Sequence, residues 1–259
     1  MPLKPDFHQN RLLAALPATE FGRLSPHLEL LVLPAGEVLS DAAREATYVY
    51  FPATAVVCLL CLMESGTSTG LAIVGNEGMV DVALVLGGAT TLGRAIVQSA
   101  GYVYRLGTRL LKDELGRGGT LQRLLLRYVQ ALIGQLGQTA ACNRHHTVAQ
   151  QLSRMLLLTF DRSGSDELAM TQEAIASVLG VRREGVTQAA RNLQARGIIR
   201  YSRGRIALLD RHGLESHACE CYRAERSTSA RFAGELASVD PGSASGSGDH
   251  GPGSERARR

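Results

Sequence analysis

The segment from Thr171 to Leu209 restricts the fold of this chain more than any other. Thr171 is a typical helix N-cap with a glutamate in the first turn, and apolar residues follow at helical spacing as far as Gly180. A second amphipathic helix begins near Arg182 and ends before Gly197. The next residues, IIRYSRGRIALL, form two short apolar runs around an Arg-Gly turn, as in a β-hairpin. The sequence therefore predicts a helix-turn-helix followed by a wing.

Positive charge is concentrated in this segment. Seven arginines and two glutamates between Thr171 and Arg205 give it a net charge of +5, whereas the whole chain of 259 residues carries +4. Polar side chains remain on the N-terminal half of the second helix, which is the part of a recognition helix that enters the major groove. The alternative is a solvated helix face, but the hairpin directly behind the helix favours DNA binding. The predicted DNA contacts are Thr171, Gln172, Arg182, Arg183, Glu184, Thr187, Gln188, Arg191, Arg203 and Arg205.

Composition agrees with one or two ordinary domains in the cytoplasm. Hydrophobic residues make up 45% and charged residues 20% of the chain. No apolar run reaches the roughly 18 to 20 residues that cross a bilayer, and the N-terminus lacks a secretory signal pattern. The five cysteines are an odd, scattered set, so reduced thiols are expected. Walker, His-Glu-x-x-His and Gly-x-Ser-x-Gly motifs are absent, and we expect no enzymatic activity.

The rest of the chain divides by its hydrophobic pattern. Asn10 to Leu24 predicts two short helices, and Leu28 to Leu106 has short runs rich in Val, Leu, Ile and Tyr between turn residues, typical of an antiparallel sandwich or barrel. Thr108 to about Ala141 predicts a helix with a break near Gly116 to Gly119, and His145 to Phe160 predicts another. The expected domains are 1–107, a sensor with two N-terminal helices and a barrel; 108–142, a long helix; 143–225, the winged helix-turn-helix; and 226–259, a disordered Ser/Gly/Pro-rich tail.

The long helix carries an apolar stripe whose members follow alternating steps of four and three residues. Burial against its own domain and dimerisation both explain such a stripe. We favour dimerisation, because a long helix between two domains is a common dimer interface. The predicted interface residues are Leu121, Leu125, Tyr128, Leu132 and Gln135.

The order of these elements, with TQEAIASVLGVRREGVTQAARNLQARGII and the upstream CNRHHTVAQQLSRMLL, resembles the Crp/Fnr (cyclic-AMP receptor protein / fumarate-nitrate regulator) superfamily over about Asn10 to Tyr222. The resemblance implies an α+β fold: a cyclic-nucleotide-binding-like β-barrel (double-stranded β-helix), a long dimerisation helix and a C-terminal winged helix-turn-helix. It also implies that Arg183, Glu184 and Gln188 contact bases. Gly185 lies where the family often has Ser or Thr, and glycine has no side chain for a phosphate or base contact there.

The family's nucleotide cassette is only partly present. The candidate pocket residues are Gly75, Glu77, Gly78 and Arg94, but alignment of the following strand puts Gly93 at the position of the phosphate-binding arginine. A shift of one residue on a strand turns Arg94 to the opposite face. We therefore expect no cofactor. The alternative function is a cyclic-nucleotide-binding sensor whose DNA binding depends on the ligand.

Cysteines and histidines give no clear metal motif. No cysteine precedes Cys58, which argues against the family's iron-sulfur cluster, and Cys58 and Cys61 lie in one apolar strand run that favours a core role. Cys219 and Cys221, beside His217, could be a thiol sensor or a metal clip, but a packed C-terminal helix is favoured. His145 and His146, near Cys142, are interpreted as a helix cap and domain hinge. No metal site is expected.

These observations predict a sequence-specific DNA-binding regulator that acts as a homodimer. Its paired recognition helices would contact half-sites one DNA turn apart, roughly 34 Å. The expected partners are double-stranded DNA, a second copy of the chain and RNA polymerase, with no membrane.

Overall fold

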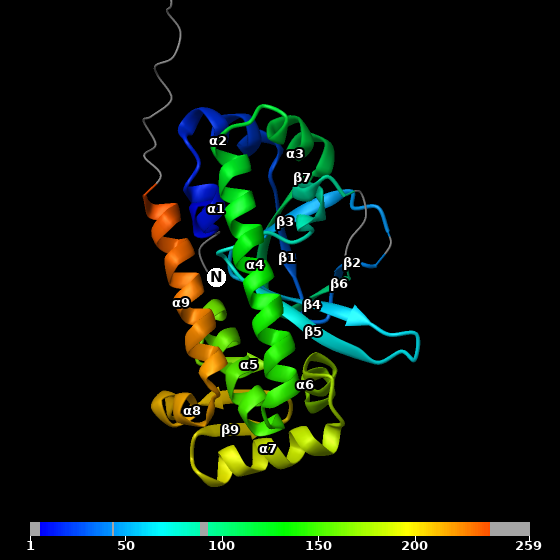
Figure 1. Ribbon diagram of the computed structural model, residues 1–259, viewed down its shortest axis with the longest axis vertical. Coiled ribbons are helices and arrows are strands. Elements are labelled where there is room, and N and C mark those ends of the chain that lie inside the picture. Colours follow the sequence, from blue (N-terminus) through cyan, green and yellow to red (C-terminus); the bar gives the residue numbers. More distant parts are fainter. Residues whose placement is uncertain (1–5, 43, 89–92, 239–259) are drawn as a thin grey trace, which may run out of the picture.

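The computed structural model describes residues 6–42, 44–88 and 93–238. A sheet domain, a long helix and a small winged domain follow one another along the chain (Figure 1). This order and the α+β class agree with the sequence prediction. No helix within the described ranges is both long enough and apolar enough to span a membrane.

Two short helices begin the described chain, as predicted. They are α1 (Arg11–Ala14) and α2 (Ala18–Leu24), and 3-10 turns occupy Phe7–Gln9 and Ser25–His27. The buried Asn10 caps α1, because its side-chain oxygen accepts hydrogen bonds from the backbone N–H groups of Leu12 and Leu13. Its amide nitrogen donates to the carbonyl oxygens of Pro52 at 2.9 Å and Gly78 at 3.0 Å. This side chain fixes the N-terminal helices to the sheet domain.

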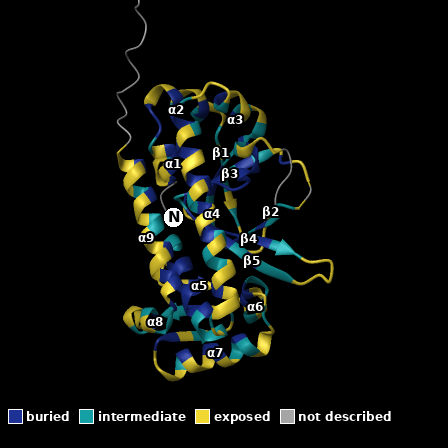
Figure 2. Cartoon of the chain, viewed as in Figure 1, coloured by how far each residue is buried: buried dark blue, intermediate teal, exposed yellow. Residues whose placement is uncertain are grey.

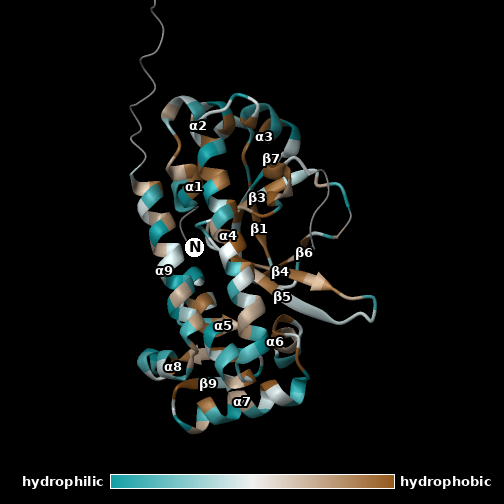
Figure 3. Cartoon of the chain, viewed as in Figure 1, coloured by the Kyte–Doolittle hydropathy of each residue, from teal (hydrophilic) through white to brown (hydrophobic). Residues whose placement is uncertain are grey.

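The sheet domain consists of two antiparallel sheets. The strands across the first are β1 (Glu29–Leu33), β7 (Gly101–Gly107) and β3 (Tyr48–Pro52). Those across the second are β2 (Val38–Ser40), β6 (Arg94–Ser99), β4 (Val56–Leu62) and β5 (Ser68–Val74), and a 3-10 helix, η3 (Val82–Leu86), follows. Apolar side chains of both sheets share one core with the long helix; Figure 3 shows the hydrophobic strands in brown. Among the described residues no strand ladder closes the two sheets into a single barrel.

Three helices lead from the sheets to the winged domain: α3 (Thr108–Leu115), α4 (Thr120–His145) and α5 (Val148–Ser163). The predicted break between α3 and α4 is confirmed, and Gly118 adopts a positive φ of 71° there. The carboxylate of Glu20, on α2, accepts hydrogen bonds from the first backbone N–H groups of α4, those of Thr120 and Leu121, each at 2.8 Å. Glu20 thereby caps α4, because the N-cap residue of α4, Gly119, has no side chain to do so.

The joint between α4 and α5 differs from the prediction. Helix α4 continues to His145, and α5 begins at Val148, where Thr147 and Gln150 form a capping box. His146 lies between them with an extended backbone. The predicted start of the second helix at His145 is therefore wrong, because the capping box at Thr147 sets the boundary.

The winged domain is built on a three-stranded sheet, and further elements surround it. They are β8 (Glu167–Ala169), α6 (Gln172–Leu179), α7 (Arg183–Ala195), β9 (Ile199–Ser202), β10 (Arg205–Leu208), α8 (Arg211–His217) and α9 (Glu220–Ala237). Its core is joined to the sheet domain. Ser68 of β5 donates to the carbonyl oxygen of Ser177 on α6 at 3.2 Å, and Gln98 of β6 donates to Thr159 on α5 at 2.9 Å.

Helix α9 corrects the predicted boundary of the tail. Residues 226–237 are helical and run beside α4 (Figure 1). Phe232 and Leu236 are buried in the main core, and the Phe232 ring lies 5.9 Å from that of Tyr128. The polar composition hid this helix, because only two apolar residues one turn apart attach its last turns to α4. The remainder of the predicted tail, 239–259, lies outside the described residues.

A buried network of charges connects the sheet domain, α5 and α9. Arg154 and Arg162, both on α5, pair with Glu225 of α9 at 2.7 and 3.4 Å, and Arg162 also pairs with Glu77 at 2.7 Å. Gln135 of α4 donates to Glu225 at 2.5 Å. Burial alone would lower the pKa of Arg162, but the attraction of Glu77 and Glu225 outweighs it and raises the pKa. Two arginines and two glutamates thus balance in charge away from water.

Removing one carboxylate from this network should destabilise the protein strongly. We expect Glu225→Ala to lower the free energy of unfolding by about 3 to 5 kcal/mol, because the arginines are left buried without a full counter-charge. Glu235→Ala, on the same helix, is the matched control. Glu235 pairs with Arg127 at the surface, so its loss should cost below about 1 kcal/mol. Urea unfolding measures both, and equal effects would contradict a structural role for the network.

Candidate nucleic-acid interface

The helix-turn-helix is formed by α6 and α7. The Thr171 hydroxyl accepts the backbone N–H of Ala174 at 3.1 Å, which caps α6 as predicted. Gly180 ends α6 with a φ of +64°, a conformation that favours glycine. Ile175 of α6 and Val186 of α7 are both fully buried and fix the angle between the two helices.

Helix α7 presents its polar face to solvent at one end of the molecule (Figure 2). Arg183 and Glu184 occupy its first turn and are exposed, and Arg191 lies two turns further on. Thr187 is half-buried, and its hydroxyl donates to Gln172 at 2.7 Å. This bond joins the N-terminus of α6 to the middle of α7, so the two helices present one continuous surface.

The wing is a two-residue hairpin whose tip lies beside α6. Arg203 and Gly204 connect β9 to β10, and both have positive φ, 50° and 73°. A type I′ turn needs this geometry, and it strains a non-glycine residue such as Arg203. The Gly204 carbonyl oxygen accepts the backbone N–H of Met170 at 2.8 Å, which fastens the tip next to Thr171. The wing therefore extends the surface made by α6 and α7.

These elements form a concave surface, and the open groove along it has a volume of about 590 Å³. Its lining contains seven of the ten predicted DNA contacts: Thr171, Gln172, Arg183, Glu184, Thr187, Arg191 and Arg203. Arg182, Gln188 and Arg205 lie outside this lining but are exposed. Within the described part of the chain, none of the five arginines of the predicted set is in an ion pair.

Four residues of this surface are not among the contacts predicted from the sequence: Gln194, Tyr201, Ser202 and Gly204. Gln194 accepts the backbone N–H of Tyr201 at 2.6 Å, and the Tyr201 hydroxyl donates to the carbonyl oxygen of Met170 at 2.9 Å. Both side chains thereby hold the wing against α7. Tyr201 lies two residues after the buried Ile199, on the same face of β9, and Gln194 follows the buried Leu193, so their spacing indicates packing rather than DNA contact.

The predicted nucleotide-pocket residues are not brought together. Glu77 lies in the buried charge network with Arg162, and a side chain at Gly75 would collide with Arg162. Gly78 packs against the Tyr128 ring, so this glycine turn is a packing feature. Arg94 forms a two-point ion pair with Asp41, with N–O distances of 3.1 and 3.0 Å. Glu77 and Arg94 line different cavities.

The cavity beside Arg94 has a volume of about 120 Å³, and apolar side chains form most of its wall. Ser40 and Asp81 are its other polar side chains. Burial raises the pKa of Asp81 to about 6. An acidic group and an arginine already bound to a carboxylate make this cavity poorly suited to a phosphate.

The predicted dimer stripe lies inside the protomer. Leu121, Leu125, Tyr128, Leu132 and Gln135 are between 0 and 9% exposed, and the four other than Gln135 belong to the main core. Gln135 instead donates to Ile73 and Glu225. The stripe is therefore buried against its own domain, which was the alternative explanation. The opposite face of α4 is exposed and includes Leu126 and Ile133.

Comparison with known proteins agrees with this architecture. The family described as the Crp-like helix-turn-helix domain matches residues 149–217. A search of the curated proteins found no match.

Two solved structures are similar over most of their length. A transcriptional regulator of the Crp/Fnr family from Eubacterium rectale is 17% identical, with 83% of this chain and 99% of that chain covered and a TM-score of 0.64. FixK2 from Bradyrhizobium japonicum is 19% identical, with coverage of 74% and 98% and a TM-score of 0.59.

A third similar structure is CLP from Xanthomonas campestris, described as a c-di-GMP responsive global regulator. It is 14% identical, with coverage of 74% and 98% and a TM-score of 0.59. The fold and the exposed, unpaired arginines define a winged-helix DNA-binding protein. The matched domain makes residues 149–217 a Crp-like helix-turn-helix domain, and the fold of the chain is similar to that of Crp/Fnr-family structures.

The buried Asp81 should make stability depend on pH. Because its pKa in the folded state is raised to about 6, the folded protein holds a proton that the unfolded chain releases near pH 4. Stability therefore falls as pH rises from about 4 to 6. Asp81→Asn, which tolerates the positive φ of 69° at this position, should remove that slope and be about 2 to 3 kcal/mol more stable above pH 6.

Urea unfolding from pH 4 to 8 measures this effect. Asp113→Asn, an exposed position on α3, is the matched control and should follow the unaltered protein. If the free energy of unfolding of Asp81→Asn fell with pH as steeply as that of the unaltered protein, Asp81 would be solvated in the folded state.

Proposed function

We propose that the chain is a homodimeric, sequence-specific transcription regulator that reads DNA with α7 and holds the phosphate backbone with its wing. The observation that carries this proposal is the concave surface where the start of α6, the first turns of α7 and the wing tip converge. Its arginines have no carboxylate partner among the described residues, so phosphates and base edges are their natural partners. The role is regulatory, with RNA polymerase as the expected partner at a promoter.

The position of each side chain on this surface suggests its role. Arg183 and Glu184 lie in the first turn of α7, where side chains reach base edges, and they suit guanine and cytosine. Gln188 lies about one turn further on, where it donates to Asn192 at 3.3 Å and can exchange that bond for adenine. Arg203 at the wing tip suits a phosphate. Gly185, between the reading residues, supplies no side-chain contact.

We further propose that the exposed face of α4 forms the dimer interface. Leu126, Gln130, Ile133 and Gly137 are all exposed and follow steps of four, three and four residues, which is the spacing of a coiled-coil seam. Leu126 is 46% and Ile133 60% exposed in the single chain, an unusual exposure for large apolar side chains. Gly137 and Ala140 permit close approach of a second helix.

The carboxylate of Asp81 and the ion-paired Arg94 in this largely apolar cavity support DNA binding that needs no cyclic nucleotide. We expect selection from a random DNA library with the full chain, without added ligand, to enrich a two-fold-symmetric site. Arg183→Ala and Glu184→Ala should each weaken binding to that site by about 10-fold or more and relax base preference in each half-site. Unchanged affinity and preference would contradict the assignment of α7 as the reading helix.

Arg203→Asn is the matched comparison in the same experiment. Asparagine tolerates positive φ, and Asn-Gly is the favoured pair in this turn, so the wing should keep its shape. We expect base preference to stay unchanged, while the slope of log affinity against log salt concentration falls by about one. Fluorescence anisotropy at several salt concentrations separates the two kinds of variant.

The dimer face has its own test. Ile133→Glu should convert the protein to a monomer in sedimentation velocity and weaken binding to the two-fold-symmetric site, because a charge would be buried in the seam. Met63→Glu is the matched control, since Met63 is 58% exposed but lies on the sheet domain. A dimer that survives Ile133→Glu would place the interface elsewhere.

A further inference from the structure

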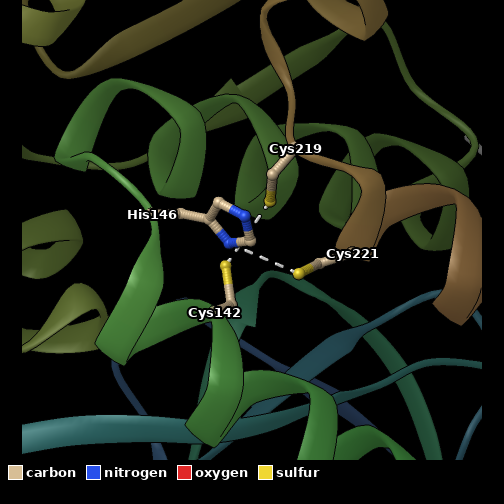
Figure 4. Close-up of side chains that lie close together, drawn as sticks. All are labelled: Cys142, His146, Cys219 and Cys221. Carbon is tan, nitrogen blue, oxygen red and sulfur yellow. Dashed lines mark hydrogen bonds between the residues drawn. The ribbon is translucent and has the colours of Figure 1, made fainter.

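Four metal-binding side chains from two distant segments meet beside the joint between α4 and α5. Cys142 belongs to the last turns of α4 and His146 follows its end; Cys219 is the N-cap of α9 and Cys221 lies in its first turn. Figure 4 shows the four side chains pointing toward one another. Their ligand atoms all lie within 4.8 Å of one another.

The spacing of these atoms matches a tetrahedral zinc site. A zinc ion with Zn–S bonds of about 2.3 Å and a Zn–N bond of about 2.0 to 2.1 Å places sulfur atoms about 3.8 Å apart and sulfur and nitrogen about 3.6 Å apart. The Sγ atoms of Cys142 and Cys219 are 3.6 Å apart, and the Sγ atom of Cys221 is 3.5 Å from Nδ1 of His146. The remaining pairs are at most 4.8 Å apart, so zinc would draw them together by roughly 1 Å at most.

The histidine is also oriented as a ligand. Its Nδ1 atom faces the cysteines, and its Nε2 atom lies 3.2 Å from a carboxylate oxygen of Glu220. A carboxylate on the far nitrogen is the usual second partner of a metal-bound histidine, because it fixes the ring and the tautomer. Glu220 itself is exposed, so it stabilises the ring without adding a fourth buried anion.

We propose that Cys142, His146, Cys219 and Cys221 bind one Zn²⁺ ion as a structural Cys₃His site. All four coordination positions are filled by the protein and the cysteines are at most 4% exposed, which leaves no open position for a substrate. The ion links the joint between α4 and α5 to the start of α9. The alternative of a reactive thiol sensor fits less well, because these sulfur atoms are shielded from solvent.

The sequence alone indicates no metal site here, because Cys142 with the histidines and Cys219 with Cys221 form two separate groups along the chain. Cys142 and His146 are four residues apart, which places them on one face at the end of a helix. What sequence could not show is that the two groups meet, since 77 residues separate Cys142 from Cys219.

Zinc content of the purified full chain tests the proposal. After growth with Zn²⁺ and desalting, we expect one equivalent of zinc per chain by plasma mass spectrometry. Replacement by Co²⁺ should give the visible bands of tetrahedral cobalt with thiolate ligands. Cys219→Ser and His146→Gln should lose most of the metal, whereas the matched controls Cys61→Ser and His145→Gln should retain it.

A variant that keeps all four ligands covers the case in which these substitutions prevent folding. Glu220→Gln is at the surface and should fold normally, yet bind Zn²⁺ about 10-fold more weakly in competition with a chelator. Zinc well below one equivalent in the unaltered protein, a disulfide between Cys142 and Cys219 in the protein as isolated, or equal zinc loss in the control variants would each overturn the proposal.

Discussion

Arg154 and Arg162 are buried on α5, and buried guanidinium groups require counter-charges. The carboxylates come from two places far apart in the sequence: Glu77 in the turn that follows β5, and Glu225 on α9. Because an unpaired buried charge costs several kcal/mol, the sheet domain, α5 and α9 must assemble together. The position of the winged domain relative to the sheets depends on this network and on the apolar core that surrounds it.

This arrangement decides which face of α4 is free. Glu225 accepts a hydrogen bond from Gln135, and Phe232 packs against Tyr128, so α9 covers one side of the long helix. The stripe that includes these α4 residues is therefore unavailable to a second chain. Leu126 and Ile133, on the other side, remain exposed. The network thus determines the proposed dimer face, and through the winged domain it also fixes the direction in which α7 points.

Ion pairs also occupy the two charged side chains of the candidate nucleotide pocket. Glu77, a candidate pocket residue, is the counter-ion of Arg162. Arg94, one residue away from the position of the phosphate-binding arginine, is paired with Asp41. Each side chain already has a partner of opposite charge, so a nucleotide would have to break an ion pair at both positions. The cavity near Asp81 remains, with a chemistry that does not favour an anion.

The sequence by itself determined the helix-turn-helix and the wing, because their signals are local. The cap at Thr171, the glycine at Gly180 and the apolar spacing that buries Val186 act within one or two turns. Sequence also determined the residue types on the reading face. Only the tertiary structure decided that α9 packs on α4, that Glu77 and Glu225 share Arg162, and that Cys142 meets Cys219. These contacts join segments that are tens of residues apart, so no periodicity or local spacing encodes them.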